Sequence, residues 1–138
     1  MTTSIKFIEK LRKSGLRPTK QRIKICEVLF ISEKTFHFTV NDLLKMVEKN
    51  TNDKISLATV YNTVHAFKKK GYLKEIAINS SKSYFDTNTT SHHHFYNEEK
   101  NELIDISDRE IEPIKINKKI LGKRIKSVEV LVKIESEN

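Results

Sequence analysis

Residues 56–86, SLATVYNTVHAFKKKGYLKEIAINSSKSYFD, carry the pattern that decides the fold of the N-terminal half. Ser56 is a favourable N-cap, and Gly71 suits the left-handed position just beyond a helix. We therefore predict a helix between them, with Lys68–Lys70 at the negative end of its dipole. The predicted buried face follows the spacing i, i+3, i+7, i+10 and comprises Leu57, Val60, Val64 and Phe67.

A β-hairpin is predicted directly after this helix. Two short apolar runs, Leu73–Ile78 and Ser83–Asp86, flank the polar stretch Asn79–Lys82, which has the composition of a turn. Helices followed by a two-stranded ribbon are typical of the winged helix-turn-helix fold, whose last helix enters the DNA major groove.

Three further helices are predicted upstream. The first covers Ser4–Lys13. The second has Pro18 in its first turn and runs to about Ile31. The third begins at a capping box formed by Thr39 and Asp42. Their predicted apolar faces comprise Ile5, Phe7, Ile8 and Leu11 in the first helix; Ile23, Cys26, Leu29 and Phe30 in the second; and Leu43, Leu44 and Val47 in the third.

Charge is distributed unevenly between the two halves of the chain. Residues 1–74 contain 16 Lys and Arg against 6 Asp and Glu, a net charge of +10, whereas residues 75–138 contain 10 against 12, a net charge of −2. A basic half joined to a mildly acidic half indicates a polyanion-binding domain attached to a domain with another role. The alternative is a set of solvated, lysine-rich helix faces.

The exposed side of the last predicted helix offers side chains that suit DNA. Tyr61 suits a phosphate or a thymine methyl group, Asn62 suits an adenine edge, and Thr59 suits either role weakly. Arg17, before the second helix, is placed to reach a minor groove, and the lysines after residue 67 are placed to hold phosphates. The residues predicted to contact DNA are Arg17, Thr59, Tyr61, Asn62, Lys68 and Lys69.

Composition excludes several classes of protein. The chain has 138 residues, of which 37% are hydrophobic, and this suits one ordinary domain or two small ones. No segment resembles a signal peptide or a membrane span, so we expect a soluble, cytoplasmic protein without a membrane partner. The single cysteine, Cys26, excludes an internal disulfide framework, and its position on an apolar helix face favours a buried hydrophobic role.

His92, His93 and His94 form the densest constellation of potential ligands, in a chain with only five histidines. In an extended segment His92 and His94 share one face and His93 points to the other, so the three do not easily bind one ion together. Two histidines plus carboxylates suit iron, manganese, zinc or cobalt, and Asp86 and Asp105 are the nearby candidates. A solvated turn is the alternative interpretation.

The C-terminal part is predicted to contain strands over Glu102–Ile106 and Ser127–Ile134, with Pro113 limiting any helix between them. The chain after Ser91 is too short for a comfortable core of its own, which favours burial against a second copy. We predict an α/β (α+β) fold: a winged-helix DNA-binding domain over residues 1–88 and a small α/β dimerisation and ligand-sensing domain over residues 89–138.

The motifs together resemble the ferric uptake regulator (Fur) family of metal-responsive dimeric transcription regulators. The resemblance covers nearly the whole chain and rests on GLRPTKQR at residues 15–22, SLATVYNT at residues 56–63 and the histidine cluster. KSYFDTNT at residues 82–89, HHHF at residues 92–95 and LIDI at residues 103–106 are similar to the iron response regulator branch of alphaproteobacteria. The resemblance implies a homodimer that binds a palindromic, AT-rich operator in double-stranded DNA.

The resemblance also implies the roles of individual residues. The regulatory metal ligands, for Fe²⁺ or Mn²⁺, would be His37, Asp86, His92, His94 and Asp105, at the junction of the two domains. The iron response branch associates the histidine triplet with haem, so His92, His93 and His94 become candidate haem ligands, with Phe95 and Tyr96 placed to pack on a porphyrin.

The sequence departs from the wider family at three places. Residues 97–100 are NEEK where many members carry the first Cys-x-x-Cys of a structural zinc site, so no such site is expected. A second family metal site would match His93 and Glu112, but it needs a histidine near the last strand, and no histidine follows His94. Cys26 precedes Glu27 and therefore lacks the Cys-Pro haem motif of some members of the branch.

The function we predict is an iron- or haem-responsive dimeric regulator of iron homeostasis genes. The first alternative is a repressor that needs Fe²⁺ or Mn²⁺, or senses peroxide, and binds no haem. From a different class, His92, His94 and two carboxylates suit a metallohydrolase with an open position for water. No general base stands beside the cluster and the chain is short for a substrate pocket, so we do not expect an enzyme.

Overall fold

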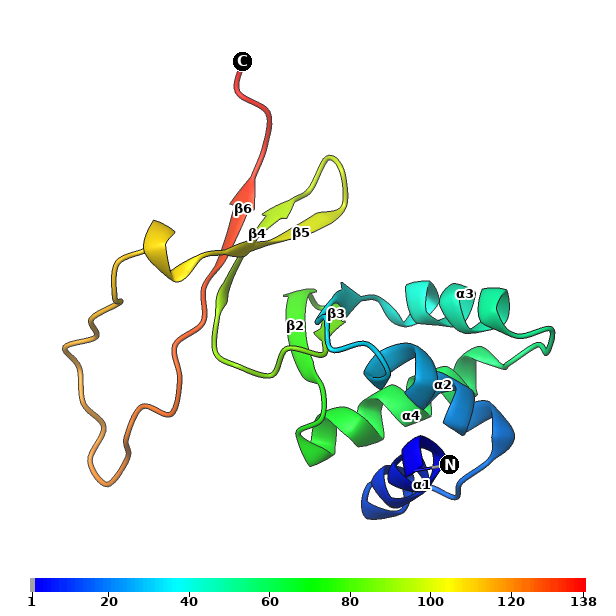
Figure 1. The fold of residues 1–138 in the computed structure, drawn as a ribbon. Helices are drawn as coiled ribbons and strands as arrows, with labels where there is room; N and C mark the ends of the chain where they lie inside the picture. Colours follow the sequence, from blue (N-terminus) through cyan, green and yellow to red (C-terminus); the bar gives the residue numbers. More distant parts are fainter. Residues whose placement is uncertain (1) are drawn as a thin grey trace. The chain divides into compact units, whose positions relative to one another are not determined.

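The computed structural model describes residues 2–138, apart from the side chains of residues 2 and 3. The chain divides into two compact units, and the division falls between Thr89 and Thr90 (Figure 1). The boundary predicted from the sequence lies after residue 88. The functions assigned to the two units stay predictions.

The first unit consists of helices followed by a small sheet. Its elements, in chain order, are α1 (Thr2–Lys13), α2 (Lys20–Phe30), β1 (His37–Phe38), α3 (Val40–Asn50), α4 (Leu57–Lys70), β2 (Lys74–Asn79) and β3 (Lys82–Asp86). β3 is the central strand of an antiparallel sheet with the order β1-β3-β2. This arrangement of helices and ribbon is the winged helix-turn-helix plan that the sequence predicts.

Side-chain caps fix where the helices begin. Thr39 and Asp42 form the predicted capping box of α3, and Ser56 caps α4 through a hydrogen bond from Thr59 N. The prediction for Pro18 is wrong: Thr19 is the N-cap of α2, so Pro18 precedes the helix instead of lying in its first turn. The Thr19 hydroxyl accepts a hydrogen bond from the third helical N–H, and this cap sets the start of the helix more strongly than a proline, which the first turn only tolerates.

The core of the first unit draws on each of its helices and on the sheet. Val60, Val64 and Phe67 of α4 are buried as predicted. Leu57 is not, because it keeps 47% of its surface exposed at the first helical position. The core cluster consists of Phe7, Leu11, Ile25, Cys26, Leu29, Phe38, Leu43, Val47, Ile55, Val60, Val64, Phe67, Leu73 and Phe85, and Ile23, Phe30 and Leu44 pack partly buried against it.

Cys26 is fully buried in this core, and burial raises the pKa of its thiol to about 12. The reactive thiolate is therefore scarce at neutral pH. We expect Cys26 in the folded protein to resist iodoacetamide, and to react readily once urea unfolds the chain. Mass spectrometry of the alkylated protein measures this difference. Equal labelling rates in the two states would show that the thiol is not buried as described.

A short polar network joins the end of α4 to the hairpin. The Glu75 carboxylate lies 2.7 Å from Lys68 Nζ and accepts a 2.6 Å hydrogen bond from Ser83 Oγ. These hydrogen bonds hold the pKa of Glu75 below its ordinary value. A carboxyl group with a lowered pKa in the folded state stabilises the protein above its unfolded pKa, and this contribution is lost as pH falls through the folded pKa.

The variant Glu75→Gln is therefore expected to lower the free energy of unfolding at neutral pH by about 1 kcal/mol. The difference from the wild type should shrink as pH falls below about 4.3, the ordinary pKa of a glutamate. Urea denaturation across this pH range measures it. Glu9→Gln, at an exposed position of α1, is the matched control. A difference that is the same at every pH would contradict the proposed role of the Glu75 charge.

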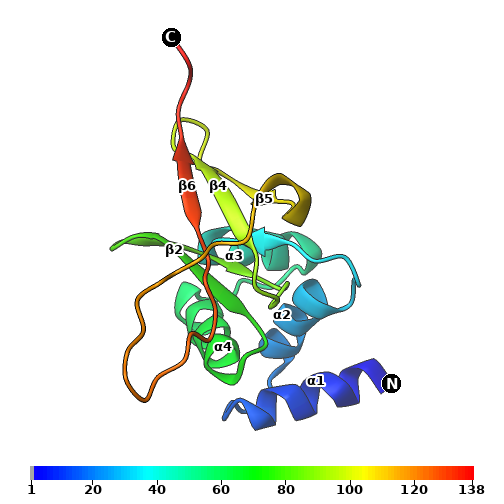
Figure 2. The same ribbon diagram turned by 90° about the vertical axis from the view of Figure 1, so that its left-hand side faces the viewer.

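The second unit is built on a three-stranded sheet with the order β5-β4-β6. Its elements are β4 (His93–Asn97), β5 (Glu102–Ile106), the 3₁₀ helix η1 (Asp108–Glu110) and β6 (Leu131–Ile134). β4 is antiparallel to β5 and parallel to β6, and Figure 2 shows β6 beside β4. Tyr96, Leu103 and Ile106 are its buried hydrophobic residues, so this core is small.

The turn after β4 overlaps residues 97–100, NEEK, where the family resemblance implies the first Cys-x-x-Cys of a structural zinc site in many members. Asn97 Oδ1 accepts hydrogen bonds from the N–H groups of Glu99 and Lys100. Glu99 Oε1 in turn accepts hydrogen bonds from Ser136 N at 2.6 Å and Ser136 Oγ at 2.8 Å. Hydrogen bonds to a carboxylate therefore tie the C-terminal tail to this turn.

The segment between η1 and β6 differs from the sequence prediction. The strand predicted over Ser127–Ile134 forms only from Leu131, and the helical structure of the described second unit is confined to η1. Large apolar side chains of this segment are exposed: Ile114, Ile116, Ile120, Leu121 and Ile125. Along residues 2–138, no helix has both the length and the apolar character that a membrane span requires.

Candidate metal centre and DNA-contact surface

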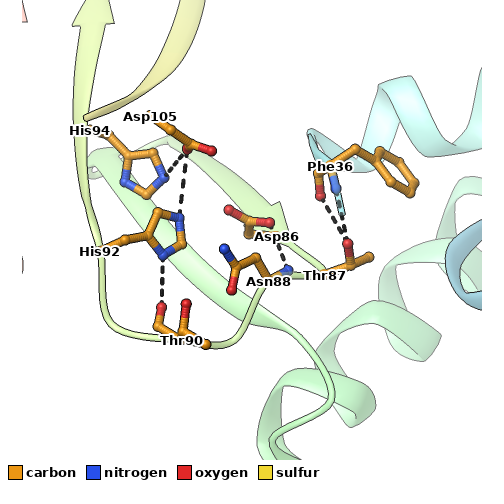
Figure 3. Close-up of polar contacts among 8 residues, drawn as sticks. All are labelled: Phe36, Asp86, Thr87, Asn88, Thr90, His92, His94 and Asp105. Carbon is orange, nitrogen blue, oxygen red and sulfur yellow. Dashed lines mark hydrogen bonds and ion pairs between the residues drawn. The ribbon is translucent and has the colours of Figure 1, made fainter. Parts of the chain in front are cut away.

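Three potential metal ligands gather beside the β4–β5 strand pair: His94 on β4, Asp105 on β5, and His92 directly before β4 (Figure 3). His94 Nε2 lies 3.1 Å from Oδ1 of Asp105, its register partner on β5, and His92 Nε2 lies 3.6 Å from the same oxygen. The two imidazole rings are 4.4 Å apart between centroids. Within this group of three residues, candidate ligand atoms lie within 4.8 Å of one another. His92 and His94 thus approach the same Asp105 oxygen, as predicted for two side chains that share one face.

The tautomer of His92 follows from its neighbours. His92 Nδ1 lies 2.7 Å from the carbonyl oxygen of Thr90. A carbonyl only accepts hydrogen bonds, so Nδ1 carries the proton, and a neutral ring has its lone pair on Nε2. That lone pair and the Asp105 oxygen are both electron-rich, so a cation between them, either a proton or a metal ion, stabilises their approach. A hydrogen bond at the far nitrogen is also how proteins orient metal-binding histidines.

His93 has a different role from its neighbours. Its Nδ1 accepts a 2.9 Å hydrogen bond from Val130 N, and the N–H of His94 donates to the carbonyl oxygen of Val130. These bonds hold the approach to β6 against the start of β4. The second family site that would use His93 and Glu112 gains no support: among residues 2–138, the ligand cluster includes neither residue, and Glu112 is exposed in the irregular segment.

In the first unit, the sheet pairs His37 with Asp86. They are directly opposite on the antiparallel strands β1 and β3, and such residues have side chains on the same face of a sheet. Asp86 Oδ1 also accepts a 2.8 Å hydrogen bond from Asn88 N (Figure 3). The chain that leaves β3 is held further by Thr87, whose N–H donates to the carbonyl oxygen of Phe36 and whose Oγ1 accepts from Phe36 N. The first unit thus fixes Asp86, a candidate from sequence spacing, opposite His37, the residue that the family resemblance adds.

The two aromatic residues predicted to pack on a porphyrin have different environments. Phe95 is partly exposed, whereas Tyr96 is 3% exposed and its hydroxyl donates to Asn101 Oδ1 at 3.0 Å. Side chains alternate across a strand, so Phe95 and Tyr96 point to opposite faces. Of these two residues, only Phe95 is available to a ligand without unfolding the local structure.

Helix α4 presents two of the predicted base-reading residues to solvent. Tyr61 is 51% exposed and Asn62 is also exposed. Thr59 differs, because its Oγ1 lies 2.8 Å from Ser56 Oγ and helps to close the first turn of the helix. The Thr59 hydroxyl is therefore partly engaged within the helix and is less available to DNA.

The predicted phosphate contacts lie at two places. Arg17 is exposed between α1 and α2, where its carbonyl oxygen accepts a hydrogen bond from Arg22. Lys68 and Lys69 are exposed near the C-terminal end of α4, although Lys68 is also paired with Glu75. At a rise of about 1.5 Å per residue, this end lies roughly 10 Å from Tyr61 along the helix. The predicted backbone contacts and the predicted base contacts therefore lie at different places along the same helix.

Periodicity alone does not reveal β1 and, with it, the position of His37. Two residues are too short for an alternating pattern, so the only indication comes from the family resemblance. The exposure of Leu57 is also missed, since its spacing fits the buried face of α4. The N-cap at Ser56 is the usable clue, because a residue at the first helical position has no preceding turn to cover it.

Comparison with known proteins places the chain in a family. The model of the "Ferric uptake regulator family" matches residues 13–135. The peroxide-responsive repressor PerR of Staphylococcus epidermidis (strain ATCC 12228 / FDA PCI 1200) is 36% identical over 98 residues, which cover 71% of this chain and 63% of the relative. PerR of Staphylococcus aureus (strain Mu50 / ATCC 700699) is 37% identical over 98 residues, covering 71% and 64%. The chain thus spans a little under two thirds of these relatives' length.

Solved structures agree on the fold. The ferric uptake regulator of Pseudomonas aeruginosa with manganese superposes with a TM-score of 0.66 at 21% identity, covering 96% of this chain and 98% of that one. The Vibrio cholerae ferric uptake regulator superposes with a TM-score of 0.69 at 21% identity, covering 94% and 98%. The predicted mixed helix and sheet fold class is confirmed. Because the family model matches most of its length, the chain belongs to the ferric uptake regulator family.

Proposed function

We propose that this protein is a metal-responsive, homodimeric DNA-binding transcription regulator, with Fe²⁺ or Mn²⁺ as its effector. The observation that carries the proposal is the cluster of His92, His94 and Asp105, in which two imidazoles and one carboxylate converge. Imidazole and carboxylate oxygen together suit Fe²⁺, Mn²⁺ or Zn²⁺. The ferric uptake regulator of Pseudomonas aeruginosa was itself solved with manganese, which is consistent with this choice.

We propose that His37 and Asp86 complete the metal site. They belong to the first unit, and the three-residue cluster belongs to the second, so one ion bound by both sets would hold the units in one arrangement. The connection between Asp86 and His92 is short, and hydrogen bonds from Thr87 and Asn88 order its beginning. A ligand that prefers one arrangement shifts the population that is able to span two half-sites on DNA.

The homodimer in this proposal is supported by the exposed apolar residues between η1 and β6 and by the small core of the second unit. Isoleucines and a leucine at this density are costly to leave in water, and a second copy would cover them. A symmetric dimer also matches a palindromic operator. Sedimentation equilibrium measures the state directly, and a strictly monomeric protein at micromolar concentration would contradict this part.

The DNA arm of the proposal is tested by selection from a random duplex library in the presence of Mn²⁺. We expect a palindromic, AT-rich sequence, whose affinity falls steeply as salt rises because neutralised phosphates release counterions. The steep dependence follows from the net charge of +10 in residues 1–74. Failure to enrich any sequence, or an affinity that stays flat with salt, would contradict it.

A second candidate is a haem-responsive regulator of the iron response branch. It is favoured by the three consecutive imidazoles and by the partly exposed ring of Phe95 beside them. A titration with haem, followed at the Soret band, tests it. Replacing His92, His93 and His94 together should abolish the shift, and an unchanged spectrum and affinity would exclude these haem ligands.

Peroxide is the third effector to test, because the curated relatives are named peroxide-responsive repressors. Peroxide reacts with Fe²⁺ and hardly with Mn²⁺. After treatment with peroxide, a peroxide-sensing protein would therefore lose DNA binding if it was loaded with iron and keep it if it was loaded with manganese. A repressor that needs metal but does not sense peroxide would respond identically in both forms.

A further inference from the structure

Helix α4 carries a large exposed apolar side chain that has no role in the function proposed above. Leu57 is 47% exposed, and Tyr61, one turn further along, is 51% exposed. Residues four apart lie on the same face of a helix, so Leu57 and Tyr61 share one exposed face of α4. The two side chains form one apolar stripe, which begins at the first residue of the helix.

The Tyr61 ring, at the aromatic end of this stripe, packs on other aromatic rings. The Tyr61 ring lies 4.1 Å from the His65 ring between centroids, at an interplanar angle of 34°. His65 in turn packs edge to face on Phe85 of β3, with centroids 5.5 Å apart. Phe85 is 2% exposed and belongs to the core. The exposed ring is therefore supported by a stack that ends in the hydrophobic core, which reduces the side-chain entropy lost when the ring binds a partner.

The chemistry of the major groove indicates what such a stripe contacts. The N-terminal residues of a recognition helix meet the base edges. Thymine is the only base that presents a methyl group there, and apolar side chains recognise it by contact. Asn62, beside Tyr61 on the same helix, has the amide that pairs with adenine. An apolar stripe next to an amide is thus suited to runs of A·T pairs.

We propose that Leu57 is a base-reading residue that contacts a thymine methyl group beside the one contacted by Tyr61, and that His65 is the positioning residue for the Tyr61 ring. The proposal rests on the DNA binding proposed above and adds two residues to it.

The test for Leu57 compares thymine with uracil, which pairs identically and lacks only the methyl group. A duplex is first selected from a random library by the wild-type protein, and each thymine is then replaced singly by uracil. In the wild type, we expect at least two thymines per half-site at which uracil weakens binding about three- to fivefold, the effect of losing one buried carbon. In Leu57→Ala the sensitivity to uracil should disappear at one of these positions and persist at the other.

The control for Leu57 is Ile31→Ala, which truncates an apolar side chain that is 60% exposed at the end of α2. This variant should keep the complete wild-type pattern of uracil sensitivity. If each uracil replacement weakens DNA binding by Leu57→Ala as much as it weakens binding by the wild type, Leu57 does not read a thymine. If no duplex is selected at all, the proposed DNA binding itself has failed, and the two failures are thereby distinguished.

The test for His65 separates ring stacking from other roles. His65→Leu keeps an apolar side chain but removes the aromatic ring, and we expect it to lower the ratio of selected to random duplex affinity about fivefold without changing the melting temperature. His65→Phe restores an aromatic ring and should restore the ratio. A loss that His65→Phe does not rescue, or an equal loss for selected and random DNA, would overturn the positioning role.

Discussion

His94→Ala is expected to weaken Mn²⁺ binding by at least about 100-fold, since even residues that only orient a ligand contribute 10- to 100-fold. His94 is 3% exposed, pairs with Asp105 in the strand register and lies 3.1 Å from its carboxylate. Removing this imidazole takes away one of the two nitrogen ligands in the cluster. Isothermal titration calorimetry of the purified protein measures the affinity.

Two further variants keep this prediction testable if His94→Ala folds poorly. The Asp105 side chain is 56% exposed, so Asp105→Asn should preserve the fold while it removes the negative charge, and it should weaken Mn²⁺ binding at least about tenfold. His93→Ala is the matched control, because the Nδ1 atom of His93 is engaged by Val130 N. It should cost stability but leave the Mn²⁺ affinity within about threefold of the wild type, a difference below about 1 kcal/mol. Equal losses in His93→Ala and His94→Ala would show that the cluster is assigned wrongly.

Tyr61→Ala and Asn62→Ala are each expected to weaken binding to the selected duplex by about 1 to 3 kcal/mol and to reduce sequence preference. Both side chains are exposed on the N-terminal half of α4, the part of a recognition helix that meets base edges. Fluorescence anisotropy with the selected duplex and with random duplexes measures both effects.

Lys69→Gln is the control for these two variants, since an exposed lysine at the other end of α4 is expected to contact phosphate only. It should weaken binding to all duplexes alike and reduce the slope of the salt dependence by about 1. If Tyr61→Ala and Asn62→Ala also weaken selected and random DNA by the same factor, these residues do not read the sequence.

Much of the first unit is predictable because local signals and burial agree there. Val60, Val64 and Phe67 have helical spacing, Ser56 and Gly71 mark the helix ends, and each is found in the predicted role. Leu57 fits the same spacing but lies in the first turn, where the chain that would cover it has not yet formed a helix. Periodicity cannot detect that difference, whereas cap position can.

The candidate metal site is predictable in part. The alternation of a strand correctly separates His93 from His92 and His94, and Asp105 lies opposite His94 because β4 and β5 pair in that register. Sequence spacing cannot supply the register itself, which depends on the turn between the strands. It cannot supply His37 either, because a strand as short as β1 exists only through its pairing with β3.

The irregular segment before β6 is not predictable from its own sequence pattern. Its isoleucines favour burial, and the single copy exposes them. Where apolar residues pack against a second subunit, the sequence is apolar, but the single chain contains no contacts that bury these residues. The strand predicted from Ser127 is accordingly shortened to the residues that pair with β4.

The most direct test of the account is the affinity for the selected duplex, measured at one ionic strength with Mn²⁺ and with a chelator, for the wild type and for Asp105→Asn. If the protein is a metal-responsive regulator, the wild-type affinity should change at least about tenfold between the two conditions, a coupling of about 1.4 kcal/mol. Asp105→Asn should lose most of this change. Wild-type affinities that agree within about twofold in metal and chelator, a difference of about 0.4 kcal/mol, would contradict the account.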